Sequence, residues 1–79
     1  MKQIRFVIGG DGPEYDGQSD GETWNGWDVV YVTPAVLEQI ALDYERMDFV
    51  EEADYVRTEP VGPDGLVSLS GWTTSLVGE

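Results

Sequence analysis

The sequence predicts an α+β fold, a small single domain in which one helix packs on a mostly antiparallel four-stranded sheet in the order β-β-α-β-β. Three observations lead to this prediction. Apolar residues alternate near the start, a capped amphipathic segment lies in the middle, and a Gly/Pro turn separates two apolar segments near the end. A chain of 79 residues has the length of one domain, residues 1–79, and its three Trp, four Tyr and two Phe are too many for a disordered segment.

The first half of the chain predicts two strands and a loop. In residues 2–8, Ile4, Phe6 and Ile8 share one face, which is typical of a half-buried strand. Residues 9–23 hold five Gly and five acids and predict an acidic, Gly-rich loop, the most mobile part of the fold. Residues 26–32 are apolar on both faces apart from Asp28, so they predict a central strand or one that is covered on both sides.

The second half predicts a helix and a hairpin. Thr33 is a good N-cap, and Pro34 suits the first helical position, so we expect a helix over 34–49. A hairpin is expected over 54–77, because segments 54–61 and 66–77 flank a turn at Gly-Pro-Asp-Gly, 62–65. The buried helix face, at spacings of three and four, comprises Leu37, Ile40, Ala41, Tyr44 and Met47 or Asp48.

Two local features of this hairpin carry further expectations. Pro60 cannot donate to a ladder, so the first strand should lie at a sheet edge or end there. A β-bulge at Gly71 would return Trp72 to the face of Leu69.

The charge balance limits the partners. Sixteen Asp and Glu face four Lys and Arg, which leaves a net charge of −12. Four bases cannot supply the basic face that nucleic acids or anionic membranes require, so we expect no direct contact with either. The chain has no Cys, no apolar run of about 18 residues and no signal-peptide pattern, which favours a cytoplasmic protein.

The residues needed for catalysis are missing. The chain has no His and no Cys, and its one lysine, Lys2, lies at the terminus. A pair of carboxylates needs a cleft for which so small a domain has little room. After Gly9-Gly10-Asp11-Gly12, the chain reads Pro-Glu-Tyr-Asp (13–16) where a phosphate loop requires Gly, Lys and Ser or Thr, and the acids would repel phosphate. We therefore expect no enzyme and no cofactor.

The acids form two clusters, and both are candidates for binding a basic partner. The first cluster lies almost entirely in the predicted loop, and the second spans the end of the predicted helix and the segment after it. The clusters are Asp11, Glu14, Asp16, Asp20, Glu22 and Asp28, then Asp43, Glu45, Asp48, Glu51, Glu52 and Asp54.

The second cluster breaks a local rule. Asp43, Glu45 and Asp48 lie near the predicted helix C-terminus, where the macrodipole favours cations. If the helix continued, Asp48 and Glu52 would be like charges at i,i+4. Acids that oppose local stability without a structural gain are candidates for function.

Carboxylates on regular structure can imitate a nucleic-acid backbone. Duplex DNA spaces its charges about 3.4 Å apart along each strand and about 1.7 Å along the axis. Helical i,i+4 neighbours lie about 6 Å apart, and same-face neighbours on a strand about 6.8 Å. A Lys/Arg-lined groove would accept such a surface.

Two alternative functions remain open. One is a weak calcium site in the 11–22 loop, which lacks EF-hand spacing. The other is a plain acidic adaptor or structural protein of phage or salt-adapted origin.

Trp24-Asn25-Gly26-Trp27 has two interpretations. Trp is enriched at interface hot spots, and this pair borders the first acidic cluster. Alternatively the Trp residues fill the core, because Trp27, Val29 and Tyr31 alternate as core residues do.

A small, cysteine-free, highly acidic chain resembles the phage-encoded anti-CRISPR proteins, particularly inhibitors of type I systems. The stretch from Trp24-Asn25-Gly26-Trp27 to Thr33-Pro34 and the closing Gly71-Trp72 are also similar to short phage and mobile-element proteins. The resemblance implies a DNA-mimicking inhibitor in the cytoplasm of the host cell. Its partner would be the basic DNA-binding surface of a CRISPR effector complex, contacted through the twelve clustered acids.

Overall fold

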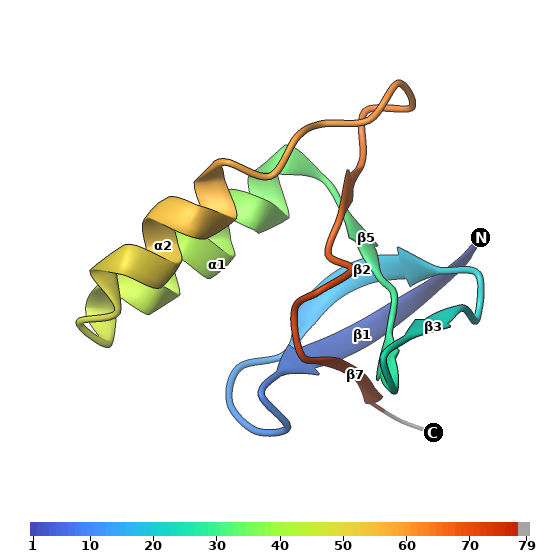
Figure 1. Ribbon diagram of the computed structural model, residues 1–79, viewed down its shortest axis with the longest axis horizontal. Helices are drawn as coiled ribbons and strands as arrows, with labels where there is room; N and C mark the ends of the chain where they lie inside the picture. Colours follow the sequence, from blue (N-terminus) through green and yellow to red (C-terminus); the bar gives the residue numbers. More distant parts are fainter. Residues whose placement is uncertain (78–79) are drawn as a thin grey trace.

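A computed structural model describes residues 1–77 and shows a mostly antiparallel α+β fold with two helices and two sheets (Figure 1). The main sheet has five strands in the order β6-β5-β2-β1-β7, and β3 pairs with β4 in a separate hairpin. The α+β prediction is confirmed, but the four-stranded, one-helix layout is wrong. The elements in chain order are β1 (Lys2–Ile8), β2 (Tyr15–Ser19), β3 (Thr23–Trp24), β4 (Trp27–Asp28), β5 (Tyr31–Val32), α1 (Pro34–Arg46), α2 (Val50–Arg57), β6 (Val67–Ser68) and β7 (Thr74–Val77).

The core lies between the helix pair and one face of the main sheet. In Figure 1 the two helices lie together at the end of the molecule opposite the N-terminus and β3. Both helices contribute to one apolar cluster with the strands, and no buried side-chain nitrogen or oxygen in residues 1–77 lacks a hydrogen-bond partner. The buried cluster consists of Phe6, Tyr15, Val30, Val32, Leu37, Ile40, Ala41, Ala53, Val56, Val67 and Leu69.

The predicted loop over 9–23 is wrong in its centre, because β2 lies there, between β1 and β5. Its composition hid it, since the strand reads Tyr-Asp-Gly-Gln-Ser. The glycine in this strand, Gly17, has a structural reason. A Cβ at this position would lie 3.0 Å from the ring of Phe6 and 3.0 Å from the carbonyl oxygen of Tyr31. The large ring on β1 fills the space that a side chain on β2 would otherwise occupy.

The predicted strand over 26–32 is divided in two. Asn25 and Gly26 both have positive φ, 54° and 85°, and form the two-residue turn of the β3–β4 hairpin. This is the backbone that Asn-Gly favours, because both turn residues need the left-handed region. The chain leaves β4 after Asp28 and enters the main sheet only at β5.

The helix predicted over 34–49 begins as expected and ends three residues early. Thr33 caps it, its hydroxyl accepting the backbone N–H of Val36 at 3.3 Å. At the other end Asp48 is left-handed (φ 63°), and the N–H of Phe49 donates to the carbonyl of Tyr44 at 2.8 Å. The rings of Tyr44 and Phe49 meet edge to face, so this is a Schellman cap with its usual apolar contact.

A second helix replaces the first strand of the predicted hairpin. Phe49, Ala53 and Val56 have the i, i+4, i+7 spacing of a helix face, and Ala53 and Val56 are fully buried in α2. The 62–65 turn itself is confirmed, with the N–H of Gly65 bonded to the carbonyl of Gly62 at 3.0 Å. Only one isolated bridge, Val61 to Val67, joins the flanks of the turn, so the 54–77 hairpin is wrong.

The last part of the chain crosses from one edge of the main sheet to the other. β6 pairs with β5, whereas β7 pairs with β1. A turn at Gly71, with the N–H of Trp72 bonded to the carbonyl of Leu69 at 3.1 Å, replaces the expected β-bulge. Trp72 still reaches the core, where its ring stacks on Tyr44.

A candidate interface for a basic partner

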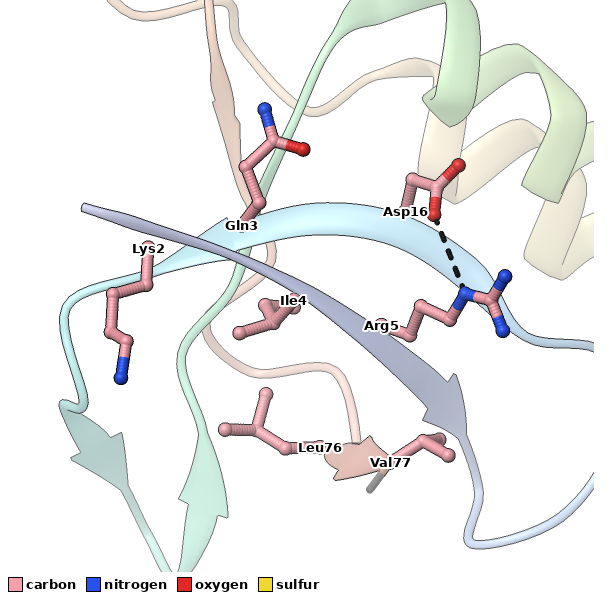
Figure 2. A pocket seen from close by; sticks show the side chains of 7 residues that line it. All are labelled: Lys2, Gln3, Ile4, Arg5, Asp16, Leu76 and Val77. Carbon is pink, nitrogen blue, oxygen red and sulfur yellow. Dashed lines mark ion pairs between the residues drawn. The ribbon is translucent and has the colours of Figure 1, made fainter. Parts of the chain in front are cut away.

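The acids beside β2 are partly neutralised by Arg5. Its guanidinium lies 3.2 Å from the carboxylate of Glu14 and 3.8 Å from that of Asp16. Figure 2 shows Arg5 reaching over β2 toward Asp16, while Lys2 points away from it. The hollow beside these residues, of about 680 Å³, lies along β1 and the end of β7. This surface therefore presents mixed charge.

The other acids of the first cluster have separate partners. Asp11 accepts the N–H of Gly12 at 2.8 Å, and Asp20 lies 3.5 Å from the N-terminal amine. Glu22 accepts the hydroxyl of Tyr31 at 3.3 Å. Burial, and then the Glu22 carboxylate, raise the pKa of Tyr31.

Asp28 has a structural role at the β7 edge. Its carboxylate accepts the N–H of Leu76 at 3.1 Å, and its carbonyl accepts the hydroxyl of Thr74. An exposed sheet edge presents unpaired N–H groups that can recruit another strand. The Asp28 carboxylate accepts one of these N–H groups, so Asp28 has a structural role that needs no partner protein.

Asp43 is also bound inside the fold. One carboxylate oxygen accepts the hydroxyl of Tyr15 at 2.8 Å, and the other accepts Arg46 at 3.1 Å. The bond between Tyr15 and Asp43 joins β2 to α1. Burial, and then the hydrogen bond to Asp43, raise the pKa of Tyr15.

Arg57 joins the two helices through Glu38 and Glu45. Its guanidinium donates to both oxygens of Glu38, at 2.8 and 3.1 Å, and to Glu45 at 2.6 Å. The hydrogen bonds from Arg57 lower the pKa of Glu38. The premise that Asp43 and Glu45 oppose the helix dipole without a structural gain is therefore wrong. Both hold α1 to a neighbouring element.

Four carboxylates of the second cluster differ from the rest. Within residues 1–77 their side chains make no hydrogen bond and no ion pair, and all four are exposed. We call them the α2 acidic strip, which consists of Asp48, Glu51, Glu52 and Asp54.

The α2 acidic strip is placed differently from its sequence prediction. Asp48 lies between two helices, so no like-charge i,i+4 pair with Glu52 arises inside one helix. Glu51 and Glu52 occupy the first turn of α2, where the dipole favours acids by about 0.3–1 kcal/mol each. The dipole thus favours Glu51 and Glu52, whereas Asp48, which follows the C-cap of α1, still lies at a helix C-terminus as predicted. What distinguishes the four acids is that no partner within residues 1–77 holds their side chains.

An exposed aromatic residue follows the strip directly in α2. The side chain of Tyr55 is 70% exposed, and with Glu51, Asp54 and Thr58 it lines a shallow hollow of about 370 Å³. The sequence prediction missed Tyr55 because it placed this segment in a strand. Its helical phase, opposite the buried Ala53 and Val56, is the signal that identifies it as outward-facing.

The Trp pair is on the surface. Trp24 and Trp27 lie directly opposite each other in the β3–β4 hairpin, 54% and 40% exposed. The core interpretation of Trp27 is therefore wrong, and the Asn-Gly between the two residues was the signal for a hairpin. Trp24 approaches Gly71, where its ring lies 4.0 Å from the position a Cβ would take.

Comparison with protein-family models, curated proteins and solved structures found no significant match. Within residues 1–77, neither helix has the length and hydrophobicity to cross a bilayer. The same residues bring together no group of three acidic side chains able to hold one metal ion. Of the five acids of the 11–22 loop, two precede β2, Asp16 lies within it and two follow it, and this strand of five residues spans roughly 17 Å.

Proposed function

We propose that this protein is a non-enzymatic inhibitor that occupies a Lys/Arg-lined nucleic-acid-binding surface of another protein. Its resemblance to anti-CRISPR proteins makes a type I CRISPR effector complex the first partner to test, in the cytoplasm of a phage-infected host. The inhibitor would block target-DNA binding by presenting carboxylates where phosphates belong.

One observation carries the proposal. Most acids of the two clusters have an intramolecular partner, whereas Asp48, Glu51, Glu52 and Asp54 have none within residues 1–77. These four lie within seven consecutive residues on one helix and the turn before it. The paired carboxylates already have a role within the fold. The four carboxylates of the α2 acidic strip have no partner within residues 1–77, so we assign them to a basic partner.

The spacing and chemistry of the strip support the proposal. Glu51 and Asp54 are i,i+3 neighbours, which places their Cβ atoms about 5–6 Å apart. The exposed ring of Tyr55 offers a face on which an arginine guanidinium can stack beside these carboxylates. The net charge of −12 would steer a basic protein toward this surface and make the association rate fall with salt.

The calcium alternative receives no support from the geometry, because no three acids of residues 1–77 converge. The plain adaptor or salt-adapted alternative makes a different prediction. If acidity serves only solubility, the position of a removed charge should not matter.

The test compares two triple variants that each remove three negative charges. The first neutralises the strip with Glu51→Gln, Glu52→Gln and Asp54→Asn. The matched control neutralises acids beside β2 with Glu14→Gln, Asp16→Asn and Asp20→Asn. Binding of labelled target DNA by a purified type I CRISPR effector complex is measured by fluorescence anisotropy with each protein as competitor.

We expect the unmodified protein and the control to displace DNA, and the strip variant to lose about tenfold or more in inhibition at low salt, since interfacial charge pairs are worth about 1.5 kcal/mol or more each. Displacement that is equal for the two triple variants would refute the role of the strip. No displacement by the unmodified protein would refute this partner.

A further inference from the structure

An apolar pocket lies where the β1–β2 loop meets the turn between α1 and α2. Its volume is about 310 Å³, near the lower limit of small-ligand pockets. We call it the corner pocket. Its lining includes Asp11, Gly12, Tyr15, Tyr44, Met47 and Phe49.

The walls of the corner pocket are held by contacts within the fold. The ring of Tyr44 stacks on Trp72 with centroids 6.2 Å apart and meets Phe49 edge to face at 6.3 Å. Trp72 is fixed in turn by a 2.8 Å hydrogen bond from its indole N–H to Glu59. Tyr15 directs its hydroxyl to Asp43. The aromatic wall of the pocket is therefore preformed, which lowers the entropic cost of filling it.

Two large apolar side chains at the pocket are only half covered. Met47 is 47% exposed and Phe49 is 48% exposed, although both line an apolar hollow. They flank Asp48, the first member of the α2 acidic strip. The apolar wall of the pocket therefore adjoins Asp48, the first residue of the strip.

We propose that the corner pocket receives one large apolar side chain, such as a tryptophan, from the same basic partner that contacts the α2 acidic strip. This inference rests on the proposed function and adds an anchor that charge mimicry lacks. A buried aromatic anchor at the centre of an interface typically carries much of its binding energy.

Charge complementarity decides which partner fits. Asp11 lines the pocket and Asp48 lies in the turn that forms one wall, so an incoming apolar residue should have cationic neighbours. A second copy of this chain is disfavoured, because each copy carries a net charge of −12. A nucleic acid is repelled for the same reason.

The anchor and the strip should respond differently to salt. Ion pairs on an exposed strip weaken as salt screens them, whereas burial of an apolar side chain in a preformed pocket does not depend on screening. A partner that uses both should keep a residual, salt-resistant affinity.

The experiment uses two synthetic peptides as probes. One has a tryptophan between two pairs of arginines, and its match has glycine in place of the tryptophan. Each is titrated into the full-length ¹⁵N-labelled protein at low and physiological salt, and the amide shifts give both the affinity and the location. We expect the tryptophan peptide to bind about fivefold tighter and to shift the amides of Gly12, Tyr44 and Met47, while both peptides shift those of α2.

Two variants make the test specific. Met47→Ala removes one wall, and Leu42→Ala removes an apolar side chain of similar exposure, 41%, that does not line the pocket. Thermal melting followed by circular dichroism checks that both remain folded. Met47→Ala should reduce the preference for the tryptophan peptide to about twofold or less, and Leu42→Ala should leave it unchanged.

The outcomes separate the two proposals. Equal affinity for the two peptides, or a preference unaffected by Met47→Ala, overturns the corner pocket and leaves the strip standing. A preference for tryptophan that Met47→Ala removes supports the pocket even if the effector assay shows no inhibition.

Discussion

Replacing Asp43 by Asn tests which effect of this carboxylate on stability is larger, its opposition to the helix dipole or its tertiary hydrogen bonds. Asp43 lies in the last turn of α1, where a carboxylate opposes the macrodipole by about 0.3–1 kcal/mol. On that basis alone, Asp43→Asn should stabilise the protein. In the folded chain the carboxylate binds two donors, so the structure predicts the opposite sign.

The magnitude follows from the two bonds. One oxygen of Asp43 accepts Tyr15 and the other accepts Arg46, and the side chain is only 24% exposed. A hydrogen bond to a charged group contributes about 1.5–3 kcal/mol and one between neutral groups about 0.5–1.5 kcal/mol. Asn has one oxygen, so one of the two donors would face an amide NH₂. If the Asn oxygen keeps the Tyr15 bond, that bond falls from the charged to the neutral range, a loss of about 1–1.5 kcal/mol. The exposed i,i+3 pair with Arg46 adds a loss of only about 0.3–0.5 kcal/mol. After the dipole relief is subtracted, we expect Asp43→Asn to destabilise by about 1 kcal/mol, which lowers Tm by about 4–8 °C.

The assay is urea unfolding at pH 7 in a double-mutant cycle with Tyr15→Phe. The coupling free energy between the two sites should be about 1 kcal/mol. Asp54→Asn is the control, because its carboxylate lies in α2 with no side-chain partner in residues 1–77, and it should change stability by no more than about 0.5 kcal/mol. Zero coupling, or stabilisation by Asp43→Asn, would refute the reasoning.

The same bond has a pH signature. The pKa of Tyr15 is raised above its ordinary value of 10.0, by burial and then by the bond to Asp43. The folded state therefore favours the protonated phenol, and this contribution is complete below pH 10 and is lost as pH rises above it. The free energy of unfolding of Tyr15→Phe should therefore fall less steeply with pH than that of the unmodified protein between pH 9 and about 11.

Two further predictions concern the sheet and the helix pair. Gly17→Ala should destabilise by roughly 1–3 kcal/mol in urea unfolding, because its Cβ would lie 3.0 Å from both the Phe6 ring and the Tyr31 carbonyl; an unchanged midpoint would mean that β2 can shift. Arg57→Gln should lower the urea midpoint at neutral pH. Since hydrogen bonding to Arg57 lowers the pKa of Glu38 below its ordinary 4.5, the ion pair stabilises above that pH and the deficit should shrink as pH falls below it, whereas a pH-independent deficit would contradict the pairing.

The reliable sequence predictions were those in which a local signal and tertiary packing agree. Strand 2–8 alternates, and the Thr33-Pro34 helix start satisfies its own backbone groups, so both were confirmed. Strand β2 was missed because its inward position at Gly17 is shaped by Phe6, a residue on another strand. Helix α2 was missed because the periodic pattern of Phe49, Ala53 and Val56 covers only a short segment, and the Gly-Pro turn after it favoured a hairpin.

The candidate site shows the same division. Composition alone located the acids, and the Asn-Gly pair was a readable signal for the exposed Trp hairpin. Which acids are occupied within the fold could not be read from the sequence. Tyr15 lies 28 residues from Asp43, and Arg57 lies 19 residues from Glu38, so these pairings exist only once the sheet and helices are assembled.

The sequence by itself determined the charge of this protein, the absence of His and Cys, the capped start of α1 and the mixed α and β content. These follow from residue chemistry and short-range backbone preferences. Only the tertiary structure decided that Asp43, Glu45 and Asp28 support the fold and that Asp48, Glu51, Glu52 and Asp54 have no partner in residues 1–77. The physical reason is that a carboxylate's role depends on which donors the chain brings within about 3 Å of it, and those donors come from distant segments.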